Sequence, residues 1–330
     1  MELPVRAASG GDDMRLYAAG FNAWNQLVFE PSQAGEEPDD LFSFVKVMGG
    51  SCFSRIVPEM CYTAVQRDNT WSIAGSSPER LLYKGDGKSC LFDSPSAISG
   101  NGKVLTAQGP DPLHQSQAIL EYPSLTAWKA DKSTNNWPCN SSVRQIAAYD
   151  AGFVILLEDG SVLSCGDPRF RDCLGREVDE FHPAHIPSLV ADLSDLGEPV
   201  KKIAAGGYSA AALTESGGLY LWGMQAPGSQ SRHSIFTNLS AIPNYVEVDG
   251  DKDVQDIAVG ESHAIALTTD GCVYVVGDNT NGQAGLGRNA KDPLESWLKL
   301  DMKTPVDWGA VAVEAGPRSS FIVTGKAHSE

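Results

Sequence analysis

One segment of this 330-residue chain occurs three times, and this internal repeat limits the possible folds more than any other feature. The copies read "IAAYDAGFVILLEDGSVLSCG" (146–166), "IAAGGYSAAALTESGGLYLWG" (203–223) and "IAVGESHAIALTTDGCVYVVG" (257–277). Each has an apolar strand, a polar pair with glycine, a second strand and a closing glycine. The pairs Asp159-Gly160, Gly217-Gly218 and Asp270-Gly271 indicate two-residue hairpin turns, with Gly160 and Gly271 at positive φ.

Fainter copies precede these three, at 64–75 and 97–109. The glycines that close the repeats are Gly20, Gly75, Gly109, Gly166, Gly223 and Gly277. Most of their spacings lie in the fifties, and a period of that size with about four short strands is typical of a propeller blade. Parallel β-helices and leucine-rich repeats have much shorter periods, and no alternation of strands and helices suggests a doubly wound sheet.

The two ends of the chain each carry half of a repeat. "LYAAGFNAWNQL" (16–27) has a strand and closing glycine without a first strand, whereas "VAVEAGPRSSFIVTGK" (311–326) has first strands without a closing glycine. Because open sheet edges are a liability, we expect these halves to pair. The sequence therefore predicts an all-β fold, a β-propeller of six to seven blades, closed by pairing N-terminal and C-terminal strands in one blade. The predicted single domain spans 14–326, with flexible tails at 1–13 and 327–330.

The last repeat resembles that of the regulator of chromosome condensation family. Its typical pattern is G-x-x-H, a D-G turn, a W-G strand end and N-x-x-G-Q-L-G. The matching positions here are Gly260, His263, Leu267, Gly271, Gly277, Asn279, Gly282, Gln283 and Gly287. The resemblance covers about 16–323 and implies seven blades, so a seventh is sought within 42–60 or 113–137. Short single-propeller members resemble the fungal alpha-tubulin suppressor type, which is associated with partners in tRNA modification and diphthamide synthesis. Another short type is associated with a histone-modifying dioxygenase.

Charge and hydropathy limit the partners. Lys+Arg 25 against Asp+Glu 42 gives a net charge of −17, which argues against direct binding of nucleic acid and favours a basic protein partner. No apolar run approaches a membrane span and the N-terminus has no apolar signal region, so we expect a monomeric propeller in the cytoplasm or nucleus, without membrane contact. The seven cysteines suggest buried thiols in a reducing compartment.

No motif in the sequence argues for catalysis, a cofactor or a metal, so we expect a protein that is not an enzyme. His263 is expected to bond to backbone inside its own blade. His182 and His185 lie in a Pro-containing loop without a second ligand pair. "GDGK" (85–88) is interpreted as a hairpin turn, and the acids at 36–40 as a solvated loop.

The leading hypothesis is therefore a non-enzymatic protein-interaction platform. The alternative is a guanine-nucleotide exchange factor for a small Ran-like GTPase. A third hypothesis is a secreted inhibitor, and the missing signal region argues against it. Exposed loop aromatics are the expected anchors. The predicted partner-binding residues, centred on the segment 294–308, are Trp297, Trp308, Glu295, Asp301 and Trp137. Other candidates are Trp128, Phe236 and Tyr245.

Overall fold

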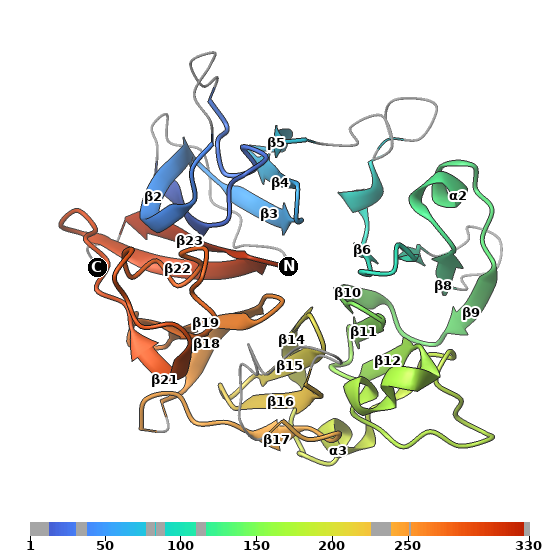
Figure 1. The fold of residues 1–330 in the computed structure, drawn as a ribbon. Helices are drawn as coiled ribbons and strands as arrows, with labels where there is room; N and C mark the ends of the chain where they lie inside the picture. Colours follow the sequence, from blue (N-terminus) through green and yellow to red (C-terminus); the bar gives the residue numbers. More distant parts are fainter. Residues whose placement is uncertain are drawn as a thin grey trace. The chain divides into compact units, whose positions relative to one another are not determined.

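The computed structural model describes residues 13–30, 38–76, 83, 90–109, 117–225, 239–250 and 252–326. Within these residues the strands form six antiparallel sheets (Figure 1). No helix in this part of the chain is long and apolar enough to cross a bilayer. Residues 1–12 and 327–330 of the predicted tails, the "GDGK" turn, Phe236 and the acids at 36–37 lie outside the described residues.

Five sheets have four strands and one has three. The first contains β1 (Met14–Gly20), β2 (Leu41–Gly50), β22 (Trp308–Gly316) and β23 (Ser319–Lys326). The second contains β3 (Phe53–Pro58), β4 (Tyr62–Arg67) and β5 (Thr70–Gly75). The third contains β6 (Ser96–Ile98), β7 (Val104–Gln108), β8 (Gln117–Tyr122) and β9 (Asn135–Cys139).

The remaining sheets are the three clear repeats. They consist of β10 (Val143–Tyr149), β11 (Gly152–Leu157), β12 (Val162–Gly166) and β13 (Ser188–Leu189); β14 (Val200–Gly206), β15 (Ser209–Thr214), β16 (Leu219–Gly223) and β17 (Asn244–Tyr245); and β18 (Val254–Val259), β19 (His263–Thr268), β20 (Val273–Gly277) and β21 (Leu294–Lys299). Short helices lie between strands: η1 (Leu91–Asp93), α2 (Leu125–Lys129), η2 (Pro168–Leu174) and α3 (Ala191–Ser194). Both ranges considered for a seventh blade hold strands of these sheets, so the described residues contain six.

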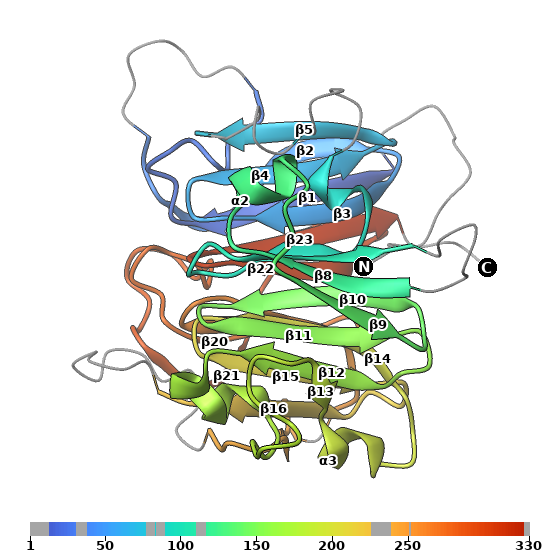
Figure 2. The same ribbon diagram turned by 90° about the vertical axis from the view of Figure 1, so that its right-hand side faces the viewer.

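The second strand of each clear repeat is buried along its whole length. Figure 2 shows β11 between its neighbours β10 and β12, and all residues of β11, β15 and β19 are buried. The run Ala210 to Ala212 in β15 has no exposed surface. Alanine favours strands weakly, so close packing on both faces rather than propensity holds this strand.

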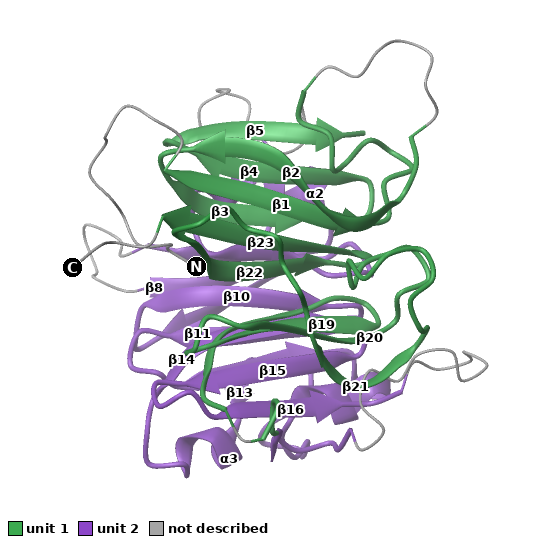
Figure 3. Ribbon diagram, turned by 90° about the vertical axis from the view of Figure 1, so that its left-hand side faces the viewer, with its two compact units in different colours: residues 1–77, 226–237, 247–330 green, residues 78–225, 238–246 purple. Residues whose placement is uncertain are grey.

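Contacts divide the chain into two compact units (Figure 3). One comprises 1–77, 226–237 and 247–330, and it contains the sheets of β1, β3 and β18. The other comprises 78–225 and 238–246, and it contains the sheets of β6, β10 and β14. The single domain over 14–326 therefore stays a prediction.

Pairing of the two ends of the chain is confirmed. β1 runs antiparallel to β23 in continuous register, from Met14 opposite Gly325 to Gly20 opposite Ser319. The Nζ atom of Lys326 lies 2.9 Å from a carboxylate oxygen of Asp13, beside the paired strands. The first and last described strands thus share one sheet, as the two half-repeats predict.

A β-bulge recurs near the start of the first strand, which the sequence did not reveal. The register shifts at Arg144, Lys201 and Gln255 of the clear repeats. After the bulge, Gln145 exchanges two hydrogen bonds with the backbone of Ile203 in the next sheet, at 2.8 and 3.1 Å. In the other unit, buried Asp256 accepts a bond from the Val313 nitrogen at 2.9 Å. Side chains beyond the bulge therefore fasten consecutive sheets together.

The hairpin turns differ from the prediction of two-residue loops. The Thr268 nitrogen donates to the Cys272 carbonyl, so the loop has three residues, 269–271, and Gly271 ends it at φ 79°. The loops that end at Gly160 and Gly217 follow the same pattern. A three-residue loop of this kind is a type I turn followed by a left-handed residue. Positive φ at Gly160 and Gly271 is confirmed, and the two-residue turns were wrong.

The closing glycines are required by close backbone approach. A Cβ on Gly277, at φ 98°, would lie 2.4 Å from the Ser262 carbonyl oxygen, and one on Gly20 would lie equally close to that of Arg318. Only glycine fits such positions. Gly109 is the exception, because it follows the second strand of its sheet, β7, and a Cβ there would meet nothing within 4 Å. The 97–109 segment is therefore the hairpin of first and second strands, and Gly109 does not close a repeat.

Candidate functional site

The loops that follow β1 and β20 are built alike. The side-chain oxygen of Asn22 accepts a hydrogen bond from the Leu27 nitrogen at 3.0 Å, and that of Asn279 accepts one from the Ala284 nitrogen at the same distance. Asn25 at φ 55° occupies the place of Gly282 at φ 83°, since asparagine tolerates the left-handed region better than most residues. The recurring N-x-x-[GN]-Q phrase therefore specifies one rigid loop.

The second amide of the phrase fixes the tip of each loop. Gln26 accepts a hydrogen bond from the Trp24 nitrogen at 2.9 Å, as Gln283 does from the Asn281 nitrogen. The tips then diverge. Asn281 donates to Asp40 at 2.8 Å, whereas the Trp24 side chain is 52% exposed. A large aromatic ring thus stands in solvent on a fixed backbone.

The Gln26 side chain also bonds to the turn at Met60, where a backbone donor is missing. Turns between first and second strands are linked by backbone bonds, such as Glu261 nitrogen to Pro317 oxygen at 2.9 Å. The corresponding bond to the next turn, at Met60, would need an N–H at residue 317, and Pro317 has none. Instead the Gln26 side chain donates to the Met60 carbonyl at 3.1 Å. Gln26 therefore joins the backbones of Trp24 and Met60, and the Met60 side chain is itself 36% exposed.

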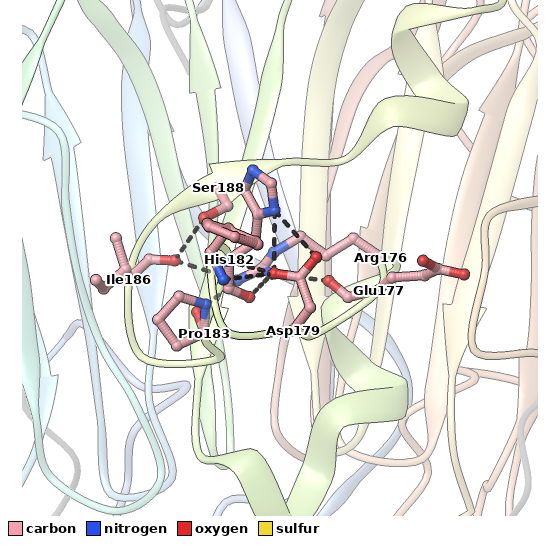
Figure 4. A network of polar contacts seen from close by, with 8 residues as sticks. Arg176, Glu177, Asp179, His182, Pro183, Ile186 and Ser188 are labelled. Carbon is pink, nitrogen blue, oxygen red and sulfur yellow. Dashed lines mark hydrogen bonds and ion pairs between the residues drawn. The ribbon is translucent and has the colours of Figure 1, made fainter.

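In the other unit, the loop after β12 is held by one arginine (Figure 4). The half-buried Arg176 guanidinium points into residues 175–188. It donates to the carbonyls of Ser164, Glu177, His182, Pro183 and Ile186 and to Oγ of Ser164, at 2.9 to 3.4 Å. Asp179 closes the tip by accepting from the nitrogens of Phe181 and His182. These main-chain bonds hold the pKa of Asp179 below its usual range, and Phe181 is 87% exposed at the tip.

Known proteins share this pattern. A family model described as "Regulator of chromosome condensation (RCC1) repeat" matches residues 254–283. The chain is 28% identical over 183 residues to the ultraviolet-B receptor UVR8 of Arabidopsis thaliana, covering 55% of this chain and 39% of that protein. It is 32% identical over 155 residues to the regulator of chromosome condensation of Mus musculus, covering 45% of this chain and 34% of that protein. The chain thus spans less than half the length of these curated relatives.

A solved structure of yeast RCC1 (Prp20) bound to Kap60 is similar over 100% of this chain and 91% of that chain, with a TM-score of 0.58 at 13% identity. This likeness shows the fold, so the six sheets are blades of a β-propeller. One repeat of the chain, residues 254–283, thus matches the regulator of chromosome condensation repeat, and about half of the chain is similar to proteins that carry it. The similarity to proteins with this repeat supports a protein-interaction or regulatory role in general.

The histidine of the RCC1 repeat, His263, is buried and bonded to a neighbouring strand. His263 is 1% exposed, and its Nε2 lies 2.9 Å from Oγ of Ser320. Ser320 is in β23, so this bond links two neighbouring blades, and the prediction that His263 bonds only inside its own blade was wrong. Burial lowers the pKa of His263 to about 4. The imidazole is therefore neutral at physiological pH.

The structure also places the other titratable groups. His182 pairs with Asp179 at 3.2 Å, and the described residues hold no group of His, Cys, Asp and Glu side chains suited to a metal ion. Burial raises the pKa of the Cys165 and Cys173 thiols to about 12. Such thiols are poor nucleophiles.

A pocket of about 190 Å³ lies beside the Arg176 loop. Its walls include Lys103, Glu121, Asp167 and His185. Buried Glu121 pairs with the Lys103 ammonium at 3.2 Å, so the pocket contains an internally neutralised pair. Nothing in this arrangement aligns a nucleophile with a base.

The predicted partner-binding residues separate into two groups. Trp297 is half-buried on β21, the outer strand of its blade, where Glu295 pairs with Lys291 at 3.3 Å and Asp301 is exposed. These three remain available candidates. The packed group contains Trp308, whose ring lies 4.1 Å from the Arg15 guanidinium carbon, and Trp137, which packs against the core.

Trp24 and Phe181 are the exposed aromatics that the sequence reasoning missed. Of the other aromatic candidates, Trp128 is buried and Tyr245 is 49% exposed. Comparison of the two N-x-x-[GN]-Q loops carries a signal for Trp24, because tryptophan stands where the other copy has Asn281. Phe181 has no repeated counterpart that would single it out.

Proposed function

We propose that this chain is a non-enzymatic interaction platform that binds a protein partner through the loops following its third strands, with Trp24 as an anchor. The carrying observation is the 52% exposed Trp24 ring on a loop fixed by Asn22 and Gln26. A preorganised aromatic loses little conformational entropy on binding and has a large surface to bury. The partner is expected to be basic, because the chain carries a net charge of −17.

A regulatory subunit for a tRNA-modifying, diphthamide-forming or chromatin-modifying partner is the finer form of this proposal. It rests on the resemblance to short single-propeller members, and a cytoplasmic or nuclear location goes with it. The yeast relative Prp20 is described as bound to Kap60 and by its binding properties toward Gsp1p and histones. Those descriptions concern Prp20, and they support protein binding as the class of function to test here.

The alternative function is guanine-nucleotide exchange on a small GTPase. It is favoured by the similarity to an RCC1-like G exchanging factor-like protein of Mus musculus, at 28% identity over 170 residues. A nucleotide-release assay with a panel of small GTPases separates the two functions. Faster release in the presence of the chain would establish exchange, and unchanged release would leave the platform.

The platform is tested by affinity purification with quantitative mass spectrometry, comparing the full chain with Trp24→Ala. Loss of a hot-spot aromatic costs about 2 kcal/mol, or roughly thirtyfold in affinity. Val45→Ala, 49% exposed on β2 of the same unit, is the control, and melting curves check that both variants fold. Partners retained equally by folded Trp24→Ala and by the unchanged chain would refute the role of Trp24.

A further inference from the structure

The Arg176 loop, residues 175–188, presents an apolar ring inside an acidic rim. Phe181 is 87% exposed, although its backbone nitrogen is fixed by the Asp179 carboxylate at 2.8 Å. Glu177, Asp179 and Glu180 are exposed beside it. The fold therefore keeps a phenylalanine in solvent at a defined position.

The neighbouring arginine forms hydrogen bonds to main-chain oxygens rather than ion pairs with the acids on this rim. The guanidinium of Arg176 is directed to carbonyl oxygens, including those of Glu177 and His182 at 3.0 and 2.9 Å. Among the described residues, no ion pair within 4.0 Å involves Glu177 or Glu180. Asp179 is paired with His182 at 3.2 Å, which leaves Glu177 and Glu180 as the unpaired acids of the rim. The rim around Phe181 thus keeps a negative charge.

We propose that Phe181 is a second anchor, which inserts into an apolar pocket of a protein partner bordered by lysine or arginine side chains. This inference rests on the proposed platform function and assigns the partner chemistry at another loop. An apolar centre with a charged rim is the usual anatomy of a binding surface. Charge complementarity at the rim mainly raises the association rate and selects the partner. An anionic membrane would be repelled by the same acids.

The test uses the full chain with the photoreactive p-benzoylphenylalanine at position 181, irradiated in cell extract. The cross-linked segment of the captured protein is then sequenced, and that protein is purified. We expect lysine or arginine residues around the cross-link, and at least about tenfold weaker binding to Phe181→Ala. A cross-linked segment without basic residues would overturn the proposed chemistry.

Two further variants separate the anchor from the rim. Glu177→Gln with Glu180→Gln keeps the ring, and it should reduce both the association rate and the salt dependence of binding. Leu189→Ala, 45% exposed on β13, is the control and should bind normally. Capture that depends on Trp24 but not on Phe181 refutes this inference and leaves the platform standing. Binding of Phe181 to anionic phosphatidylserine vesicles instead of protein would also overturn it.

Discussion

Alanine at Gly160 and at Gly271 should have unequal effects on stability, although both glycines end three-residue hairpin loops. Their φ angles are 84° and 79°, so the backbone strain of an L-residue is the same at both, about 1 kcal/mol. The surroundings differ. A Cβ on Gly271 would meet nothing within 4 Å, whereas one on Gly160 would lie 2.4 Å from Cβ of Pro199.

The contact with Pro199 adds an overpacking cost of about 1–3 kcal/mol. We therefore expect Gly271→Ala to lower the free energy of unfolding by about 1 kcal/mol and Gly160→Ala by about 2–4 kcal/mol. Urea unfolding followed by tryptophan fluorescence measures both. Gly102→Ala, at φ 85° in open space, is a control that should match Gly271→Ala. Equal losses at Gly160 and Gly271 would contradict the packing argument.

Three other changes test the contacts between and within blades. Asp256→Ala removes the carboxylate that accepts from the Val313 nitrogen and should lower the free energy of unfolding in urea by about 1–3 kcal/mol; an unchanged midpoint would contradict a stabilising bond between these two sheets. The pKa of His263 is about 4 in the folded chain, below about 6.5 when unfolded, so the contribution of His263 to stability is complete above pH 6.5 and is about 2 kcal/mol smaller at pH 5. Burial raises the pKa of Glu59 to about 7, and this group changes stability in the opposite direction over the same range. His263→Gln should therefore make the variant gain stability relative to the unchanged chain as pH falls from 6.5 to 5, and an unaltered pH profile would exclude a contribution from His263. Trp308→Ala removes the ring stacked with Arg15 and should lower the melting temperature without changing partner capture, whereas lost capture at normal stability would restore Trp308 as a docking residue.

Much of the fold could be predicted because the repeat fixes strand order. The two half-repeats predicted that the first and last strands pair, since no other partner completes either half, and the structure supplies the register, with Gly20 opposite Ser319. The loop lengths could not be predicted, because Asp270-Gly271 is compatible with both two-residue and three-residue turns. The bulges before Gln145 and Asp256 have no signature in a pattern of apolar residues.

The candidate site was less accessible to sequence reasoning. Aromatic residues in long loops gave Trp297 and Trp308 the same weight, but the structure stacks Trp308 on Arg15 within the sheet of the paired ends. Exposure of Trp24 and Phe181 depends on side-chain bonds that hold each loop, such as those of Arg176. These bonds join residues whose proximity is set by the fold.

The sheet shared by β1 and β23 also imposes an order of events during synthesis. Met14 leaves the ribosome long before Gly325, with which it pairs. The entropy cost of closing a loop grows only slowly with its length. The main consequence of the long separation is therefore the delay before β1 can pair, rather than a loss of stability. Until β23 arrives, β1 has a free edge on which another chain could pair. A strand that is synthesised early is thus among the last to gain both of its neighbours.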